Sequence, residues 1–247
     1  MKKFFMFLAG VATMAISAVS AFAQEEMSAA DILSGSETPL NQALKTKFIE
    51  GDPKFMSLIV ICLIIGLALA IERILYLSFS KINTKKLVEN VEAALKEGGI
   101  EKAKEVCRET RGPVASIFYQ GLLRYDQGLD VVEKTIISYG SVQQSQLESG
   151  LSWISLFIAI APSLGFLGTV IGMINAFDAI QSAGDISPNV VAGGMKIALI
   201  TTVGGLIVAM ILQIFYNYIL AKIESITIDM EDSSISLIDV LTKYGKK

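Results

Sequence analysis

The middle of the chain reads Ala161-Pro162-Ser163-Leu164-Gly165-Phe166-Leu167-Gly168-Thr169-Val170-Ile171-Gly172-Met173-Ile174-Asn175-Ala176-Phe177, within a run, residues 149–177, that has no charged side chain. About 20 apolar residues are enough for a helix to cross a bilayer. Small residues recur in this run at helical spacing and share one face; they are Ala161, Gly165, Gly168, Gly172 and Ala176. Such a face lets a neighbouring backbone approach closely, and Thr169 beside it supplies a hydroxyl without the cost of a buried charge. The stretch predicts a membrane span suited to a channel.

The composition agrees with a membrane protein, because 52% of the 247 residues are hydrophobic. The net charge is only -3, and the basic residues form no stripe with interleaved aromatics, so we expect no nucleic-acid partner. The chain has no histidine, the commonest general base and metal ligand near neutral pH. The spans also hold no nucleophile paired with a base. We therefore expect no enzyme activity, no metal site and no cofactor.

The N-terminus has the pattern of a secretory signal peptide over residues 1–23. Lys2 and Lys3 precede an apolar stretch, and the small-x-small sequence Ala21-Phe22-Ala23 follows it. A retained signal anchor is the alternative, but the short apolar run and the well-formed cleavage site favour cleavage after Ala23. Residues 24–54 then form an extracytoplasmic segment with one amphipathic patch, at Leu40, Leu44 and Phe48.

Three spans follow the signal, and they divide the rest of the chain. We expect transmembrane helices at residues 55–79, 149–177 and 190–220. A cytoplasmic helical domain, residues 80–148, separates the first two, and an extracytoplasmic loop, residues 178–189, separates the last two. A cytoplasmic C-terminal helix follows at residues 221–247. The assignment of sides follows from the positive-inside rule, because residues 80–148 are rich in Lys and Arg whereas the 178–189 loop has neither. Cys62 and Cys107 then belong to different compartments, and no disulfide is expected.

The cytoplasmic parts have helical patterns. A helix over Lys85 to Lys96 is expected to end at Gly98-Gly99, and Arg111-Gly112-Pro113 restarts the chain. From about Asp130 the pattern predicts a helix that continues without interruption into the second span, as a rod. The tail from Lys222 to Lys243 keeps apolar residues at helical spacing: Ile223, Ile226, Met230, Leu237 and Leu241.

The third span repeats the features of the second. Its small-residue face comprises Ala198, Thr201, Gly205 and Ala209, with Thr202 beside it. A partner helix can slide or turn against such a smooth wall, and the hydroxyls can hold an acid or a water. Thr169, Thr201 and Thr202 are the candidate pore-lining residues. The competing interpretation is ordinary helix packing, because Gly, Ala and Thr are common at membrane helix interfaces and Thr can bond its own backbone carbonyl.

The second-span motif, residues 161–177, resembles that of the MotA/TolQ/ExbB proton-channel family, and Ala198-Leu199-Ile200-Thr201-Thr202-Val203-Gly204-Gly205-Leu206, followed by Tyr216-Asn217, resembles that of its third span. The two motifs occur in the right order and topology, and three spans resemble ExbB and TolQ, whereas MotA-type subunits have four. The extended extracytoplasmic segment behind a signal peptide is more similar to an ExbB. The resemblance implies a homo-oligomeric ring, usually a pentamer, in the bacterial inner membrane around an ExbD-like single-span partner. Proton flow would drive that partner, and a TonB-like protein would pass the work to outer-membrane transport.

One departure from the family concerns charge in the third span. The family usually carries a membrane glutamate five residues before the threonine that matches Thr202, and Ile197 stands there. No acidic residue lies in the second or third expected span, so the resemblance implies that the partner supplies the essential carboxylate. Lys196 is interpreted as a residue at the outer membrane edge that extends to the headgroups, with a subunit interface or the pore as the alternative.

Two further functions stay open from the sequence. One is a TolQ-like or motility-type motor of the same family with another partner. The other is a membrane scaffold that uses the same helix bundle without conducting protons. The scaffold predicts that replacing Thr169 and Thr202 leaves function intact.

Overall fold

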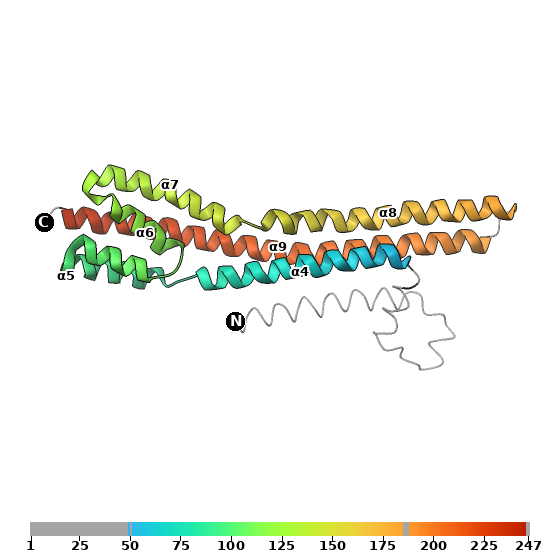
Figure 1. Cartoon of the computed structure of the whole chain (residues 1–247), viewed down its shortest axis with the longest axis horizontal. Helices are drawn as coiled ribbons and strands as arrows, with labels where there is room; N and C mark the ends of the chain where they lie inside the picture. Colours follow the sequence, from blue (N-terminus) through green and yellow to red (C-terminus); the bar gives the residue numbers. More distant parts are fainter. Residues whose placement is uncertain (1–48, 50, 185–187, 246–247) are drawn as a thin grey trace, which may run out of the picture. The chain divides into compact units, whose positions relative to one another are not determined.

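The computed structural model describes residues 49, 51–184 and 188–245. The expected signal peptide and most of the segment after it, including Leu40, Leu44 and Phe48, lie outside the described residues. The described part is helical: α4 (Pro53–Ser80), α5 (Thr84–Glu109), α6 (Pro113–Leu123), a 3₁₀ turn η1 (Tyr125–Gln127), α7 (Leu129–Glu148), α8 (Leu151–Ala183) and α9 (Pro188–Gly245) (Figure 1). Three of its helical stretches are long and apolar enough to cross a membrane, and they contain α4, α8 and α9.

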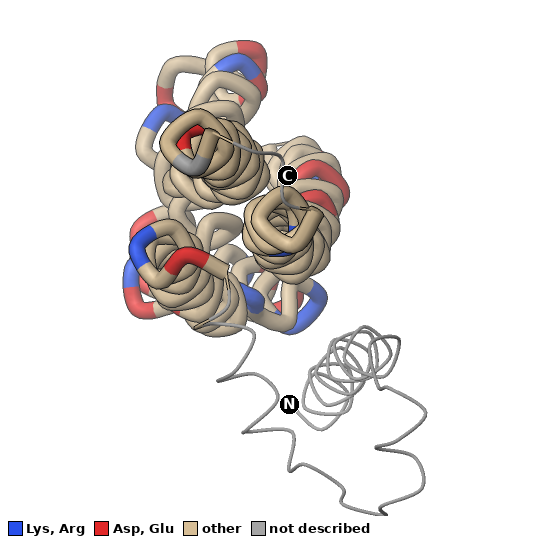
Figure 2. Tube along the Cα trace, turned by 90° about the vertical axis from the view of Figure 1, so that its right-hand side faces the viewer, with Lys and Arg blue, Asp and Glu red and all other residues tan. Residues whose placement is uncertain are grey.

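The chain divides into two compact units. Unit 1 contains residues up to Ala68 and Trp153–Phe215, so it takes the first half of α4, nearly all of α8 and the first half of α9. Its described residues carry few charges, namely Asp52, Lys54, Asp178 and Lys196, and its tube is therefore mostly tan in Figure 2. Unit 1 is the apolar part of the molecule.

Large apolar side chains hold α4 against the other two helices of unit 1. Ile59, Val208 and Leu212 form a buried core with Ala161, and Phe157 and Leu164 are among the partly buried residues that pack on it. Leu212 lies against Gly66, where a Cβ would be 2.7 Å from its Cδ1 atom. On this side of α9 the space between helices is filled by large side chains.

Unit 2 contains Leu69–Ser152 and Tyr216–Lys247. Within it α6 packs against both α5 and α7, and its core includes Leu87, Val91, Ile117, Phe118 and Ile136. The helical pattern predicted for the tail is confirmed, since this part of α9 buries Ile223, Ile226, Met230, Leu237 and Leu241.

Local sequence signals set most helix ends in unit 2. The Asn83 side chain accepts a hydrogen bond from the Lys86 N–H and so caps α5. Gly99 has φ +69 and kinks α5, so the chain breaks its helix at the expected place but continues as a helix to Glu109 instead of ending there. Gly112 has φ +122 and precedes Pro113 at the first turn of α6.

The predicted rod from residue 130 into the second span is wrong. α7 ends at Glu148, Ser149 has non-helical φ and ψ of -53 and 134, and Gly150 has φ +86 before α8 begins at Leu151. Gly150 lies against Arg73, because a Cβ there would be 2.7 Å from the Arg73 Nε atom. The lone glycine at position 150 allows a backbone conformation that L residues rarely adopt, and this interrupts the predicted rod.

Two other boundaries differ from those expected. α8 continues to Ala183, so that the first residues of the expected 178–189 loop are helical. α9 runs without a break from Pro188 to Gly245, so the third span and the tail belong to one helix. No proline or glycine after Gly205 interrupts α9 before its end, which explains this continuity.

Candidate functional site

The small residues of α8 and α9 bring the two backbones into direct contact. A Cβ on Gly205 would lie 2.5 Å from the Ala161 carbonyl oxygen, and a Cβ on Gly165 would lie 2.9 Å from the Thr201 carbonyl oxygen. One on Gly168 would meet the Thr201 Oγ1 atom at 2.7 Å. Because no larger side chain fits these positions, the glycines set the separation of the helices. We call this contact the α8–α9 seam.

The seam continues toward the loop between the helices. A Cβ on Gly172 would lie 3.3 Å from the Ala198 Cβ atom, and Ala176 contacts Gly194. Gly194 is a seam residue that the sequence analysis missed. The signal was available, because residues 194, 198, 201 and 205 are spaced by four, three and four, as are 161, 165, 168 and 172 on α8.

Nearly all the predicted small residues are buried in the seam. Ala161, Ala176, Ala198 and the three α8 glycines are buried, as is Gly205. Ala209 differs, since it is only half-buried on α9. The structure therefore places the predicted faces of α8 and α9 against each other.

Thr169 and Thr202 meet across the seam. Their Oγ1 atoms are 2.9 Å apart, and Thr169 also donates to the Phe166 carbonyl oxygen at 2.8 Å. A hydroxyl has only one proton, so when Thr169 donates to Phe166 it can only accept from Thr202, and the Thr202 hydroxyl also has a second acceptor, the Gly165 carbonyl oxygen at 3.3 Å. The Thr202 oxygen then keeps lone pairs that can accept a hydrogen bond from a water or a protonated carboxyl. Both residues are half-buried and so retain exposed surface.

Thr201 has a different environment from the other two threonines. It is fully buried, and its hydroxyl donates to the Ala198 carbonyl oxygen at 2.8 Å. Its Oγ1 atom also lies 3.5 Å from the Gly165 carbonyl oxygen. The side chain of Thr201 is thus enclosed between α8 and α9, whereas those of Thr169 and Thr202 are only half-buried.

The charge pattern of the site is that of a polar but uncharged surface. Ile197 is half-buried, and Lys196 is exposed on α9. The described residues contain no cluster of three or more His, Cys, Asp or Glu that could hold a metal ion. Threonine hydroxyls do not titrate near neutral pH, so the pair of Thr169 and Thr202 can donate and accept hydrogen bonds but adds no charge to the seam.

Comparison with known proteins gives concordant matches. The family model described as the MotA/TolQ/ExbB proton channel family matches residues 109–232. A biopolymer transport protein ExbB homologue of Methanothermobacter thermautotrophicus is 33% identical over 183 residues, which cover 74% of this chain and 63% of that protein. The biopolymer transport protein ExbB-like 3 of Synechocystis is 30% identical over 162 residues, covering 62% of this chain and 74% of the relative.

Other matches show how far the similarity extends. The biopolymer transport protein exbB1 of Vibrio cholerae is 38% identical over 90 residues, and the match spans only 40% of its length. The chain thus spans less than two thirds of the length of both the Methanothermobacter and Vibrio relatives. A solved structure of MotAB from C. jejuni has a TM-score of 0.50 at 17% identity, covering 94% of this chain and 89% of that one, and it supports the fold.

The apolar helices, the α8–α9 seam and the family match agree on the kind of protein that this chain is. Two seam helices carry the two motifs, and three helical stretches are apolar enough to span a membrane. The match includes both motifs, since it runs from residue 109 to residue 232. The chain is a multi-pass membrane protein that belongs to the MotA/TolQ/ExbB proton channel family.

Proposed function

We propose that this chain is the ring-forming subunit of an ExbB-type motor in the bacterial inner membrane, which uses proton flow to energise TonB-dependent transport across the outer membrane. Support comes from the family and from relatives named biopolymer transport protein ExbB. Identical copies, in a pentamer, would surround an ExbD-like single-span helix. The α8–α9 seam would be the wall against which that helix moves.

The hydroxyl pair of Thr169 and Thr202 is the observation that carries the proposal. It occurs where two glycine-rich helix faces meet, and both side chains retain exposed surface. Hydrogen bonds in a low-dielectric setting are stronger than in water, so an accepting Thr202 oxygen can hold a protonated carboxyl or a water in place. Thr201 is left out of this role because it is buried.

The partner must supply the acidic group. Residues 151–177 and 190–220 contain no Asp or Glu, and Ile197 is aliphatic. A proton crossing the membrane needs a group that exchanges it, and an intramembrane carboxylate is the usual one. The ExbD-like helix would bring its carboxylate to the pair, where Thr202 accepts from the protonated form.

The orientation is part of the same proposal. We propose a cleaved signal at residues 1–23, an N-terminus outside the cytoplasm and a C-terminus inside. Lys and Arg gather in residues 80–148, which favours a cytoplasmic location for this part of the chain.

Energy-dependent uptake of a TonB-dependent solute tests the function. The host strain lacks this gene and carries the wild type, the double variant Thr169→Val with Thr202→Val, or the matched control Thr201→Val. We expect loss of uptake in the deletion, rescue by the wild type and by Thr201→Val, and a reduction of roughly two- to tenfold in the double variant, since a hydrogen bond between uncharged groups contributes about 0.5–1.5 kcal/mol. Membrane levels and partner binding must be equal among the strains.

Three results would contradict the proposal in different ways. Normal uptake in the deletion strain excludes TonB-dependent transport and favours a TolQ-like or motility-type motor. Full rescue by the double variant would mean that Thr169 and Thr202 contribute only to helix packing, and it would favour the non-conducting scaffold. An equal loss with Thr201→Val means that the seam as a whole, rather than the exposed pair, is required.

A further inference from the structure

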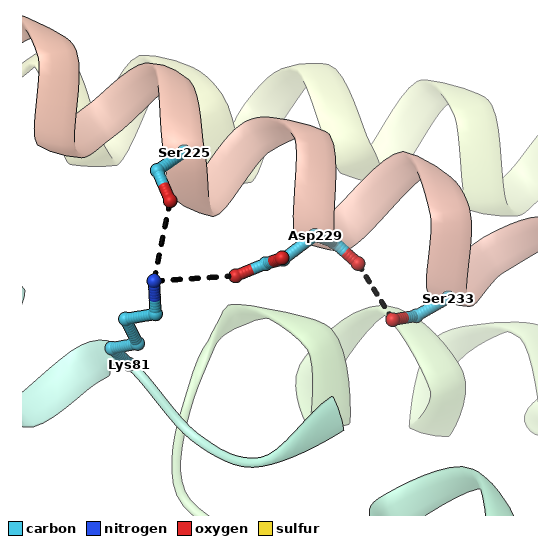
Figure 3. Close-up of polar contacts among 4 residues, drawn as sticks. All are labelled: Lys81, Ser225, Asp229 and Ser233. Carbon is cyan, nitrogen blue, oxygen red and sulfur yellow. Dashed lines mark hydrogen bonds and ion pairs between the residues drawn. The ribbon is translucent and has the colours of Figure 1, made fainter. Parts of the chain in front are cut away.

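Two lysines, one directly after α4 and one on α9, lie close together in unit 2 beside exposed apolar side chains. Lys81 follows α4, and its ammonium group donates to the Ser225 hydroxyl on α9 at 3.2 Å. Lys222, one turn before Ser225, donates to the Ser78 hydroxyl on α4. Figure 3 shows Lys81 between Ser225 and Asp229. We call Ser78, Lys81, Lys222 and Ser225 the lysine–serine cluster.

The cluster has more positive charge than its neighbours compensate. Among the described residues, Lys81 pairs only with Asp229, at 3.8 Å, the outer limit of an ion pair, and Lys222 has no ion pair. Burial lowers the pKa of Lys222 below its usual range, and the nearby Lys81 lowers it further. Two cations held close together and partly desolvated are stabilised by an anion that contacts both.

The hydroxyls of the cluster have distinct roles. Ser78 donates its proton to the Ile74 carbonyl oxygen at 2.6 Å, so it can only accept, and it positions the Lys222 ammonium. Within the described part of the chain, the Ser225 hydroxyl bonds only to Lys81, as acceptor. Its own proton is available to an anion. The cluster therefore offers two ammonium groups and one hydroxyl as donors.

The residues beside the cluster are apolar and exposed. Leu75 and Phe79 on α4 are 53% and 81% exposed, and Leu220 on α9 is 44% exposed. Exposed apolar side chains next to lysines are the pattern expected where a membrane helix passes from acyl chains to headgroups. A ligand with an anionic head and a long apolar tail matches both parts of this surface.

We propose that the lysine–serine cluster binds the phosphate of an anionic phospholipid, with Lys81, Lys222 and Ser225 as donors and with the acyl chains along Leu75, Phe79 and Leu220. Asp229 competes for Lys81 and limits the affinity. The proposed lipid site requires that the chain is a membrane protein, but it does not require that the chain conducts protons. A variant that no longer binds lipid can therefore show normal uptake, and a variant with impaired uptake can still bind lipid.

Binding of phosphatidylglycerol to the full-length, detergent-solubilised protein tests the site, with native mass spectrometry as the readout. The variants are Lys81→Gln, Lys222→Gln and Asp229→Asn, and the matched control is Lys134→Gln at an exposed position of α7. We expect each cluster lysine to contribute about fivefold to the affinity, since a basic residue near an anionic surface contributes about 1 kcal/mol. Asp229→Asn should raise affinity, and Lys134→Gln should leave it unchanged.

Two controls distinguish a bound lipid from a bound soluble anion. Phosphatidylglycerol should protect Lys222 of the wild-type protein from amine acetylation, whereas inorganic phosphate at equal concentration should not. Equal protection by inorganic phosphate would overturn the lipid assignment in favour of a soluble phosphate. Equal lipid binding by Lys81→Gln, Lys222→Gln and Lys134→Gln, with correctly assembled protein, would overturn the site.

Discussion

The three candidate threonines have the same side chain but different surroundings. Thr201 and Thr202 are neighbours in sequence, and a helix turns by about 100° per residue. This turn buries Thr201 between the helices and leaves Thr202 half-exposed next to Thr169. Exposure, rather than residue type, decides which hydroxyl is available to a partner.

Cys107 provides a residue-scale prediction that does not depend on the proposed function. It is buried in unit 2, and burial raises the pKa of its thiol to about 12 from an ordinary value of 9.0. The thiolate is the reactive form, and a shift of about three units makes it about a thousandfold rarer at pH 8. With Cys62→Ala in place, alkylation by iodoacetamide at pH 8 should therefore be very slow in native protein and fast after denaturation.

The same shift predicts how stability depends on pH. The folded state keeps the Cys107 proton when the unfolded state has already lost it, so the free energy of unfolding falls as the pH rises from 9.0 toward about 12. Cys107→Ala should remove this part of the pH dependence in thermal melts. Rapid alkylation of the native protein would contradict the buried, protonated thiol.

At the scale of elements, the α8–α9 seam predicts opposite effects for two glycines of α9. Gly205→Ala places a methyl 2.5 Å from the Ala161 carbonyl oxygen, whereas a Cβ on Gly193 would meet nothing within 4 Å. We expect Gly205→Ala to destabilise the protein by roughly 1–3 kcal/mol. Gly193→Ala should be neutral or stabilising, because alanine favours helix.

Thermal unfolding of both variants in the same detergent measures this difference. One kcal/mol shifts the melting temperature of a chain of this size by about 2–4 °C. Equal melting temperatures for Gly205→Ala and Gly193→Ala would mean that the two helices do not pack through their backbones.

The break between α7 and α8 gives a second element-scale prediction. Gly150 has φ +86 and faces the Arg73 side chain, whereas Gly140 lies inside α7 with no atom within 4 Å of its Cβ position. Gly150→Ala should cost roughly 1–3 kcal/mol because an L residue is strained at this φ. Gly140→Ala should not destabilise, and a melting temperature for Gly150→Ala as high as that of Gly140→Ala would argue for a continuous helix.

At the scale of the whole molecule, the two units differ in chemical character. Unit 1 is mostly uncharged along its helices, whereas unit 2 has Lys and Glu pairs on α5, such as Glu92 with Lys96 at 2.7 Å. The hydrogen bond from Lys96 lowers the pKa of the Glu92 carboxyl, with a further contribution from the lysine charge. Such exposed pairs suit a helix in water.

The proposed orientation predicts which side of the membrane each part faces. Lys134 on α7 and Gln181 near the end of α8 are both exposed. In intact spheroplasts, a membrane-impermeant maleimide should label cysteine at Gln181 but not at Lys134, and lysis should expose both, in a Cys62→Ala and Cys107→Ala background. Labelling at Lys134 before lysis would reverse the orientation.

Helical periodicity and membrane apolarity are local properties of the chain, so the helical class, the family and the glycine faces of residues 161–176 and 198–205 could be predicted from the residues. The kink at Gly99 and the start of α6 at Pro113 were predictable for the same reason. The folded arrangement was needed to show that Gly150 breaks the predicted rod, that Gly194 joins the seam, and that Thr201 is buried while Thr202 pairs with Thr169. These outcomes depend on which face of one helix another helix covers, and spacing along one helix does not contain that information.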